Sequence, residues 1–207
     1  MQNEKIQAKM RKKWKITTQP SKKTVTIAPN HLDQHFIVEE PNKVWVSDIT
    51  YVATQEGWLY VAVVLDLFSR KVVGLSMGDR LHTDLIMKAL KQALWHRRIR
   101  DGLMHHSDRG CQYTSKDFQE MTGRHGIKLS MSAKGRCYDN AVAESFFHTL
   151  KTEHTDLCNY RIREEAESSI FEYVEVFYNR QRLHSTIGYV SPVDFENHWE
   201  NRLQNIV

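Results

Sequence analysis

Three acidic residues stand where packing alone favours another type of side chain. Asp48 lies in the β-branched and aromatic run VWVSDITY, Asp108 ends a predicted short strand and opens a Gly-containing loop in HHSDRGCQY, and Glu144 falls in an Ala- and Phe-rich segment. For each acid taken singly, a surface-facing or capping carboxylate is the favoured interpretation. Brought together, the three would repel one another and would stay ionised only beside cations. Carboxylate oxygens favour Mg²⁺ or Mn²⁺ over zinc.

Neighbouring residues offer weaker candidates for the same chemistry. Alternate residues of a strand face opposite sides, so of His105 and His106 only the second can point with Asp108. A packing or hydrogen-bonding role is the favoured interpretation for that histidine. Asp139 is the second choice for a carboxylate ligand, and Asp66 is interpreted as the start of a turn.

The elements that must position these acids follow from hydrophobic periodicity. Three apolar, β-rich runs in close succession predict an antiparallel meander, and the pattern then alternates between helix and strand. We expect strands at 44–54, 58–67, 71–77, 103–108 and 127–132, and helices at 83–94, 115–124, 140–155 and 163–178. This order predicts an α/β fold with a mixed sheet, a three-stranded antiparallel meander plus parallel strands, and flanking helices. The first and fourth strands can be neighbours, which would bring Asp48 beside Asp108.

Composition excludes several classes of protein. The 207 residues are 41% hydrophobic and 26% charged, as in an ordinary soluble globular protein. The longest apolar run, 58–65, is too short to cross a membrane, so we expect a cytoplasmic protein with no membrane partner. The three cysteines have no CxxC spacing, which argues against structural zinc. We divide the chain into an arm and linker at 1–40, a core with C-terminal helices at 41–200 and a tail at 201–207.

Charge is concentrated at the N-terminus. Residues 1–24 hold eight Lys or Arg and one acid, although the whole chain carries a formal charge of only +4. This basic arm, which includes Lys12 and Lys13, suits a polyanionic partner such as DNA. A solvated terminus is an equally good interpretation of the charge alone.

A family resemblance joins these observations. Fifty-nine residues separate Asp48 from Asp108, and 35 separate Asp108 from Glu144. This spacing, together with the strings WVSDITY, HSDRGCQY, DNAVAESFFHTLKTE and FYNRQRLHSTIGYVSPVDF, resembles bacterial insertion-sequence transposases made by frameshifting between two reading frames. Their catalytic core is similar to that of retroviral integrases. The likeness covers about 44–195.

The resemblance implies a fold, a cofactor and a reaction. It implies an RNase H-like fold in which Asp48, Asp108 and Glu144 bind two Mg²⁺ or Mn²⁺ ions. The activity implied is metal-dependent cleavage of phosphodiester bonds at the element ends, which frees a 3′-hydroxyl, followed by strand transfer into target DNA. Arg136 stands where the family pattern leads us to expect Asn.

Several residues are candidates for contacts with DNA. Lys151 follows Glu144 by seven residues, nearly two helical turns, so both share a face, and the resemblance implies that it holds a DNA phosphate. Asn140 either caps the helix, which we favour, or contacts DNA. Arg180 and Arg182 suit phosphate contacts, although an ion-paired turn is an alternative. The aromatic residues of 171–178 are expected in the core or at an oligomer contact.

The resemblance also implies partners. We expect binding to element-end and target DNA, a homo-oligomer on DNA, association with the nucleoid in that state, and contact with the first-frame helix-turn-helix protein. The N-terminal arm is interpreted as the remnant of a DNA-recognition region. Two alternatives stay open: a nuclease without the transfer step, and a non-catalytic DNA-binding fragment that inhibits full-length transposase.

Overall fold

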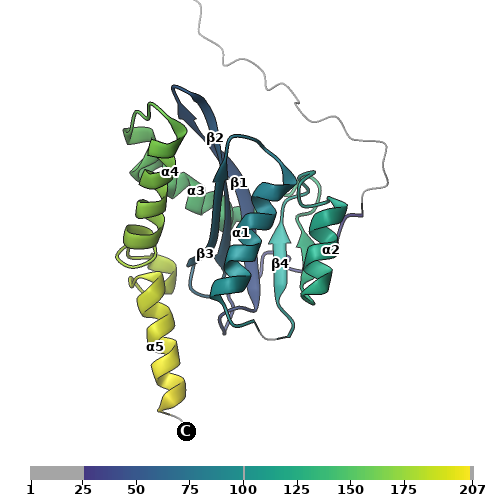
Figure 1. The fold of residues 1–207 in the computed structure, drawn as a ribbon. Coiled ribbons are helices and arrows are strands. Elements are labelled where there is room, and N and C mark those ends of the chain that lie inside the picture. The colour runs from purple at the N-terminus through teal and green to yellow at the C-terminus, as the bar shows by residue number, and fades with distance from the viewer. Residues whose placement is uncertain (1–25, 100, 206–207) are drawn as a thin grey trace, which may run out of the picture.

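The computed structural model describes residues 26–99 and 101–205, which form a five-stranded mixed sheet flanked by helices (Figure 1). The sheet order is β3-β2-β1-β4-β5, with antiparallel pairing among the first three strands of the chain and parallel pairing of β1 with β4 and of β4 with β5. The strands are β1 (Val44–Thr54), β2 (Gly57–Asp66), β3 (Val72–Gly78), β4 (Met104–Ser107) and β5 (Lys128–Met131). The predicted mixed sheet, with its meander and parallel strands, is confirmed.

The helices pack on both faces of the sheet. In Figure 1, α1 and α2 lie on the near side, and α3 crosses behind the strands. The helices are α1 (Thr83–His96), α2 (Lys116–Arg124), α3 (Ala141–Glu153), α4 (Arg163–Glu172) and α5 (Pro192–Gln204). Helix α1 approaches β3 closely at Gly74, where a Cβ atom would lie 2.2 Å from the carbonyl oxygen of Ala89. Glycine at this position therefore sets the distance between that helix and the sheet.

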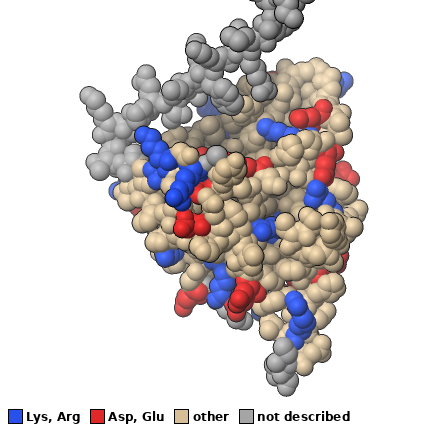
Figure 2. Space-filling view, turned by 180° about the vertical axis from the view of Figure 1, so that it is seen from behind, with Lys and Arg blue, Asp and Glu red and all other residues tan. Residues whose placement is uncertain are grey.

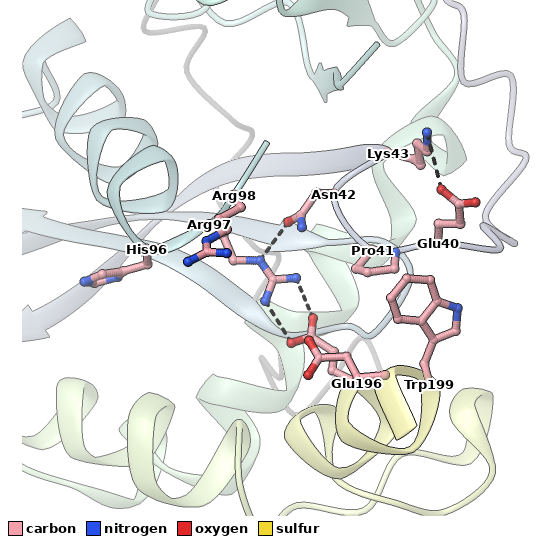
Figure 3. Close-up of a pocket in the computed structure, with 10 residues that line it drawn as sticks. Glu40, Pro41, Asn42, Lys43, His96, Arg97, Arg98, Glu196 and Trp199 are labelled. Atoms are coloured by element: carbon pink, nitrogen blue, oxygen red, sulfur yellow. Dashed lines mark hydrogen bonds and ion pairs between the residues drawn. The ribbon is translucent and has the colours of Figure 1, made fainter. Parts of the chain in front are cut away.

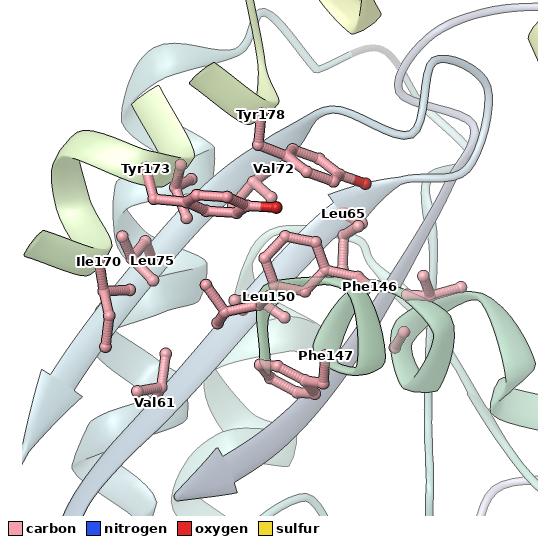
Figure 4. Close-up of a cluster of buried hydrophobic side chains, with 14 of the residues drawn as sticks. Val61, Leu65, Val72, Leu75, Phe146, Phe147, Leu150, Ile170, Tyr173 and Tyr178 are labelled. Atoms are coloured by element: carbon pink, nitrogen blue, oxygen red, sulfur yellow. The ribbon is translucent and has the colours of Figure 1, made fainter. Parts of the chain in front are cut away.

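The alternation of β1 divides the core into two clusters. Val46 and Val52 pack with α3 and α4 on one face, whereas Trp45 packs with α1 and α2 on the other. Figure 4 shows the first cluster, in which Phe146 and Leu150 of α3 lie against the sheet. The ring of Phe146 meets that of Tyr178 at a centroid distance of 4.8 Å. This packing fixes the rotation of α3, and with it the direction of its polar face.

A π-helix, Tyr173–Tyr178, continues α4 where the sequence predicts one uninterrupted helix over 163–178. Its wider turn is closed by the bond from the Asn179 amide to the carbonyl of Val174, 3.0 Å. Tyr173 and Tyr178 are buried, whereas Phe171 and Phe177 are 51% and 41% exposed. The aromatic run therefore lies half in the core and half on the surface.

Helix α5 lies outside the predicted elements, although its start carries sequence signals. Ser191 caps it by accepting a bond from the Asp194 amide, 3.2 Å, and Pro192 occupies the first turn. Figure 3 shows how the helix is attached to the body through Arg97 and Glu196, whose Nη2 and Oε1 atoms lie 2.7 Å apart. The same Nη2 also lies 3.0 Å from Asp66 Oδ2. A buried ionic network thus joins α5 to the sheet.

The pKa values of the two acids in that network are shifted in opposite directions. Burial raises the pKa of Asp66 although Arg97 opposes it. Burial also works to raise the pKa of Glu196, but bonds from Arg97 and the charge of Lys71 outweigh it and lower the pKa.

Among the described residues, no helix has the length and apolar character needed to cross a membrane.

Candidate active site

Asp48 and Asp108 lie next to each other because their strands are paired in parallel. Val46 of β1 is paired with His106 of β4, and each aspartate follows its paired residue by two positions. Two positions along a strand return a side chain to the same face. Asp108 stands one residue beyond the end of β4 and is exposed, whereas Asp48 lies inside β1 and is mostly buried.

A tight turn fixes the Asp108 carboxylate. Its Oδ1 accepts a bond from the Gly110 amide, 2.9 Å. A Cβ atom at position 110 would lie 2.9 Å from the same oxygen, so a larger residue would displace the carboxylate. The intervening Arg109 donates from Nε to the Ser132 carbonyl, 2.7 Å. Glycine in the string HSDRGCQY therefore has a local structural reason.

The third acid, Glu144, is supplied by helix α3. It is exposed near the start of α3, and it lines a pocket of about 380 Å³ together with Asp108. The same pocket is lined by three cationic side chains: Arg109, Lys134 and Arg136. The pocket thus combines acids that suit a divalent cation with bases that suit phosphate. Sequence reasoning did not single out Arg109 or Lys134, since surface bases carry no distinctive pattern.

Asp48 lies within electrostatic range of the other two acids. Its pKa is raised from 3.8 to about 7, mainly by burial; the negative charges of Asp108 and Glu144 add to the rise, and the Ile49 amide and Lys151 oppose it. The site therefore brings together the three acids selected from the sequence. Their donor set, oxygen alone, fits a hard divalent cation. In this conformation, no group of three His, Cys, Asp or Glu side chains among residues 26–99 and 101–205 is arranged to hold one ion.

Lys151 lies at the edge of this site. Its Nζ is 5.2 Å from the centroid of the Tyr51 ring, and its charge reaches Asp48. The position near the acids is the one that its spacing from Glu144 predicts. Its contact with a DNA phosphate stays a prediction.

Asn140 does not cap α3. It occupies the N-cap position but makes no side-chain capping bond. Instead, the buried amide donates from Nδ2 to the Ser47 carbonyl, 3.2 Å, and links the helix to β1. The capping hypothesis is therefore wrong, and the contact with DNA stays a prediction.

Arg180 and Arg182 make contacts within the chain. Arg182 pairs with Glu153, with Nη2 2.6 Å from Oε1, and Arg180 donates from Nε to the Glu175 carbonyl, 3.1 Å. The Arg182–Glu153 ion pair agrees with the ion-paired alternative that the sequence left open, whereas the contact of Arg180 is a hydrogen bond to the main chain. Contacts of both arginines with DNA stay predictions. Lys12 and Lys13 lie outside the described residues.

Asp139 is fully buried and serves the loop before α3. Its carboxylate accepts bonds from Asn30 Nδ2 at 2.9 Å, Gln34 Nε2 at 3.0 Å and the Ala133 amide at 2.8 Å. It thereby joins the segment before β1 to the pocket that contains Asp108. Sequence reasoning missed this network because two of its partners, Asn30 and Gln34, lie more than 100 residues away along the chain.

The buried histidines also have structural partners. His106 bonds Ser130 Oγ at 2.8 Å and Ser132 Oγ at 3.3 Å, as the hydrogen-bonding interpretation predicts. Asp66 accepts a bond from the Phe68 amide, 3.0 Å, at the start of the turn expected there.

Figure 2, which views the molecule from behind, shows basic and acidic side chains interspersed over the described residues of this face. On the described part of this face, basic residues therefore do not gather into one broad area.

Comparison with known proteins defines the class. An integrase core domain model matches residues 38–137, and a second integrase core domain model matches residues 144–199. The fold is similar to the catalytic core of bovine immunodeficiency virus (BIV) integrase, with a TM-score of 0.56, 17% identity and coverage of 79% of this chain and 99% of that one. It is also similar to the HTLV-2 integrase core solved in complex with magnesium, with a TM-score of 0.53, 18% identity and coverage of 75% and 97%. At this identity the likeness shows the RNase H-like fold.

Closer relatives are bacterial. A 31 kDa protein of insertion element IS600 from Shigella sonnei is 48% identical over 190 residues, covering 92% of this chain and 70% of that protein. Transposase InsF of insertion sequence IS3A from Escherichia coli (strain K12) is 48% identical over 171 residues, covering 83% of this chain and 59% of that protein. The chain belongs to the integrase core family, among the insertion-sequence transposases. It spans about three-fifths of the length of the IS3 transposases and corresponds to a transposase catalytic domain.

Proposed function

We propose that the chain cleaves phosphodiester bonds at the ends of an insertion element and joins the freed 3′-hydroxyl to target DNA. The observation that carries the proposal is geometric: Asp48 and Asp108 each follow the paired residues Val46 and His106 by two positions, and Glu144 of α3 lines the same pocket as Asp108. Such a cluster favours divalent cations, Mg²⁺ or Mn²⁺, and the proposed number is two. Bound by these acids, the ions would activate the attacking oxygen and stabilise the leaving one.

The remaining groups of the site position the DNA strand. Gly110 holds one oxygen of Asp108, so this ligand does not need to be ordered when a cation arrives. We assign a DNA phosphate to Lys151, which lies near Asp48, and further phosphates to Arg109, Lys134 and Arg136 at the pocket. The sequence predicted Asn140, Arg180, Arg182, Lys12 and Lys13 as further DNA contacts, and these assignments remain part of the proposal.

The proposal extends to organisation and partners. Residues 1–40 would act as arm and linker, 41–200 as the core and 201–207 as a tail. A homo-oligomer would hold two element ends, and the first-frame protein would supply recognition of the end sequence. Because the substrate is DNA, we place the active protein at the nucleoid of the cytoplasm.

The test is an assay with labelled element-end DNA, supercoiled target and Mn²⁺. Joined molecules are expected, and nicks without joining would restrict the activity to that of a nuclease. Glu144→Gln should give neither product, while Glu172→Gln, at an exposed site on α4, should match the unchanged protein. DNA binding without any metal-dependent product would favour the regulatory alternative and contradict the proposal.

A further inference from the structure

Two aromatic rings form an exposed pair beside the acids. Tyr51 of β1 and Trp58 of β2 are 48% and 51% exposed. Tyr51 is paired with Tyr60, two residues from Trp58, so the two rings lie diagonally on one face of the hairpin. Their centroids are 4.8 Å apart and their planes meet at 75°. We call this pair the aromatic shelf.

The shelf adjoins the candidate active site. Tyr51 follows Asp48 by three residues on β1, so the two side chains leave the strand on opposite faces. Lys151 links them, because its Nζ lies 5.2 Å from the centroid of the Tyr51 ring, within the range of a cation–π contact, and its charge acts on Asp48. The Tyr51–Trp58 centroid distance and the distance from Lys151 Nζ to the Tyr51 centroid together set an upper limit on the separation of Lys151 Nζ from the Trp58 ring. This limit is about three nucleotide rises of 3.4 Å each. The shelf and the cation can therefore contact the same short piece of a DNA strand.

The packing of the hairpin does not account for the Trp58 ring. Arg163 holds this part of the hairpin through the main chain, donating from Nε to the Trp58 carbonyl at 3.0 Å and from Nη2 to the Glu56 carbonyl at 3.0 Å. The ring itself belongs to neither buried core cluster. A half-exposed indole held in place by its backbone is thus available for a ligand.

We propose that the aromatic shelf stacks a nucleobase of the strand whose phosphate contacts Lys151. Aromatic rings stack every base because each base has a π-face, and a cation beside the ring suits the adjoining phosphate. A base inside a continuous duplex is already stacked on both sides. The shelf therefore accepts an unpaired or terminal base, for which unstacking costs least. This inference rests on the proposed function, because it takes DNA as the substrate of the neighbouring acids.

The test compares Trp58→Ala with the unchanged protein in metal-free buffer at one salt concentration. The probes are a single-stranded oligonucleotide of about 15 nucleotides and an abasic strand of equal length. For the strand with bases, the dissociation constant should rise by at least about fivefold, whereas for the abasic strand it should change by less than about twofold. Trp95→Ala is the matched control, since this ring is 87% exposed on α1 and belongs to neither the aromatic shelf nor the pocket that contains Asp108.

A second measurement uses the unchanged protein. The fluorescence of 2-aminopurine in the strand should be quenched on binding, and Trp58→Phe should retain most of the quenching while Trp58→Ala loses it. The proposal would be overturned if Trp58→Ala weakened binding of the strand with bases and of the abasic strand equally. It would also be overturned if Trp58→Ala kept its melting temperature and bound the strand with bases as tightly as the unchanged protein does. Because these measurements need no metal, failure of the shelf leaves metal-dependent cleavage intact. If the proposed function were wrong, no metal-dependent cleavage would be observed, while the base-dependent binding would remain.

Discussion

Asp48 of β1 and Asp108, one residue beyond the end of β4, each follow the parallel Val46–His106 pair by two positions. This relationship turns a separation of 59 residues in the chain into a contact between neighbouring strands. Asp48 is held within β1, whereas Asp108 lies in a turn fixed by Gly110. The site therefore combines one acid that the sheet positions with one that a loop positions.

Loss of Arg97 should destabilise the protein strongly. Its side chain is 13% exposed and bonds both Asp66 and Glu196, whose side chains are 0% and 9% exposed. Arg97→Met leaves Asp66 buried without its cation and leaves Glu196 with Lys71 alone, which should cost about 3–5 kcal/mol of unfolding free energy in urea denaturation.

The control for this prediction is Arg124→Met. Arg124 pairs with Glu120 at 3.6 Å, but the two side chains are 78% and 48% exposed, so the loss should stay below about 1 kcal/mol. Equal losses in the two variants would contradict the role of the network that attaches α5.

Asn179 ties the segment after the π-helix to the edge of the sheet. Its Oδ1 accepts from the Val72 amide at 2.9 Å, and its Nδ2 donates to the Val72 carbonyl at 3.0 Å. Asn179→Ala leaves two buried backbone groups unpaired and should cost about 2–4 kcal/mol. Thermal denaturation beside Asn197→Ala, an exposed position on α5, checks the cost; similar melting temperatures for both variants would refute it.

The outline of the sheet could be predicted from sequence because hydrophobic period and chain order restrict it closely. Strands 44–54 and 71–77 differ from the structure by at most one residue at each end. The π-helix could not be predicted, since it depends on packing of Tyr173 and Tyr178 against α3 and the sheet rather than on local pattern. Ser191 and Pro192 are sequence signals for the start of helix α5, but hydrophobic periodicity alone does not use such signals.

The candidate site divides in the same way. Spacing and flanking strings were enough to select Asp48, Asp108 and Glu144, which the fold brings within electrostatic reach of one another. The role of Asn140 could not be derived, because its partner is the main chain of Ser47, 93 residues away. Contacts set by tertiary structure alone leave no trace in local spacing.

Stability should fall in acid through His105. Burial, followed by the charge of His106, lowers the pKa of His105 from 6.5 to about 3, so the folded chain keeps this ring neutral where the unfolded chain binds a proton. Stability is therefore complete above about pH 6.5 and is lost as the pH falls toward 3, by about 1.4 kcal/mol per pH unit for this ring.

The check is urea denaturation of the unchanged protein and His105→Gln between pH 7 and pH 4. The variant should show a shallower loss of stability with falling pH, whatever its stability at pH 7. Parallel slopes for the two proteins would contradict the assignment of a neutral, buried His105.

Asp139 should control the order of the loop beside the pocket. Asp139→Asn places an amide against the donors of Asn30, Gln34 and the Ala133 main chain, so at least one bond must be lost. Hydrogen exchange should accelerate in 30–34 and 132–140, while Asp156→Asn, at an exposed position, should leave both segments unchanged. Unchanged exchange in the first variant would refute this role.

The most direct test of the central claim replaces one proposed metal ligand by a softer one. Asp108→Cys offers a thiolate, which binds Mg²⁺ poorly but accepts softer divalent ions. Cleavage of labelled element-end DNA should disappear in Mg²⁺ and return in Mn²⁺ or Cd²⁺, while Asp108→Ala stays inactive in every metal. Cleavage by Asp108→Cys in Mg²⁺ at the rate of the unchanged protein would contradict a metal-binding role for the acids at this site.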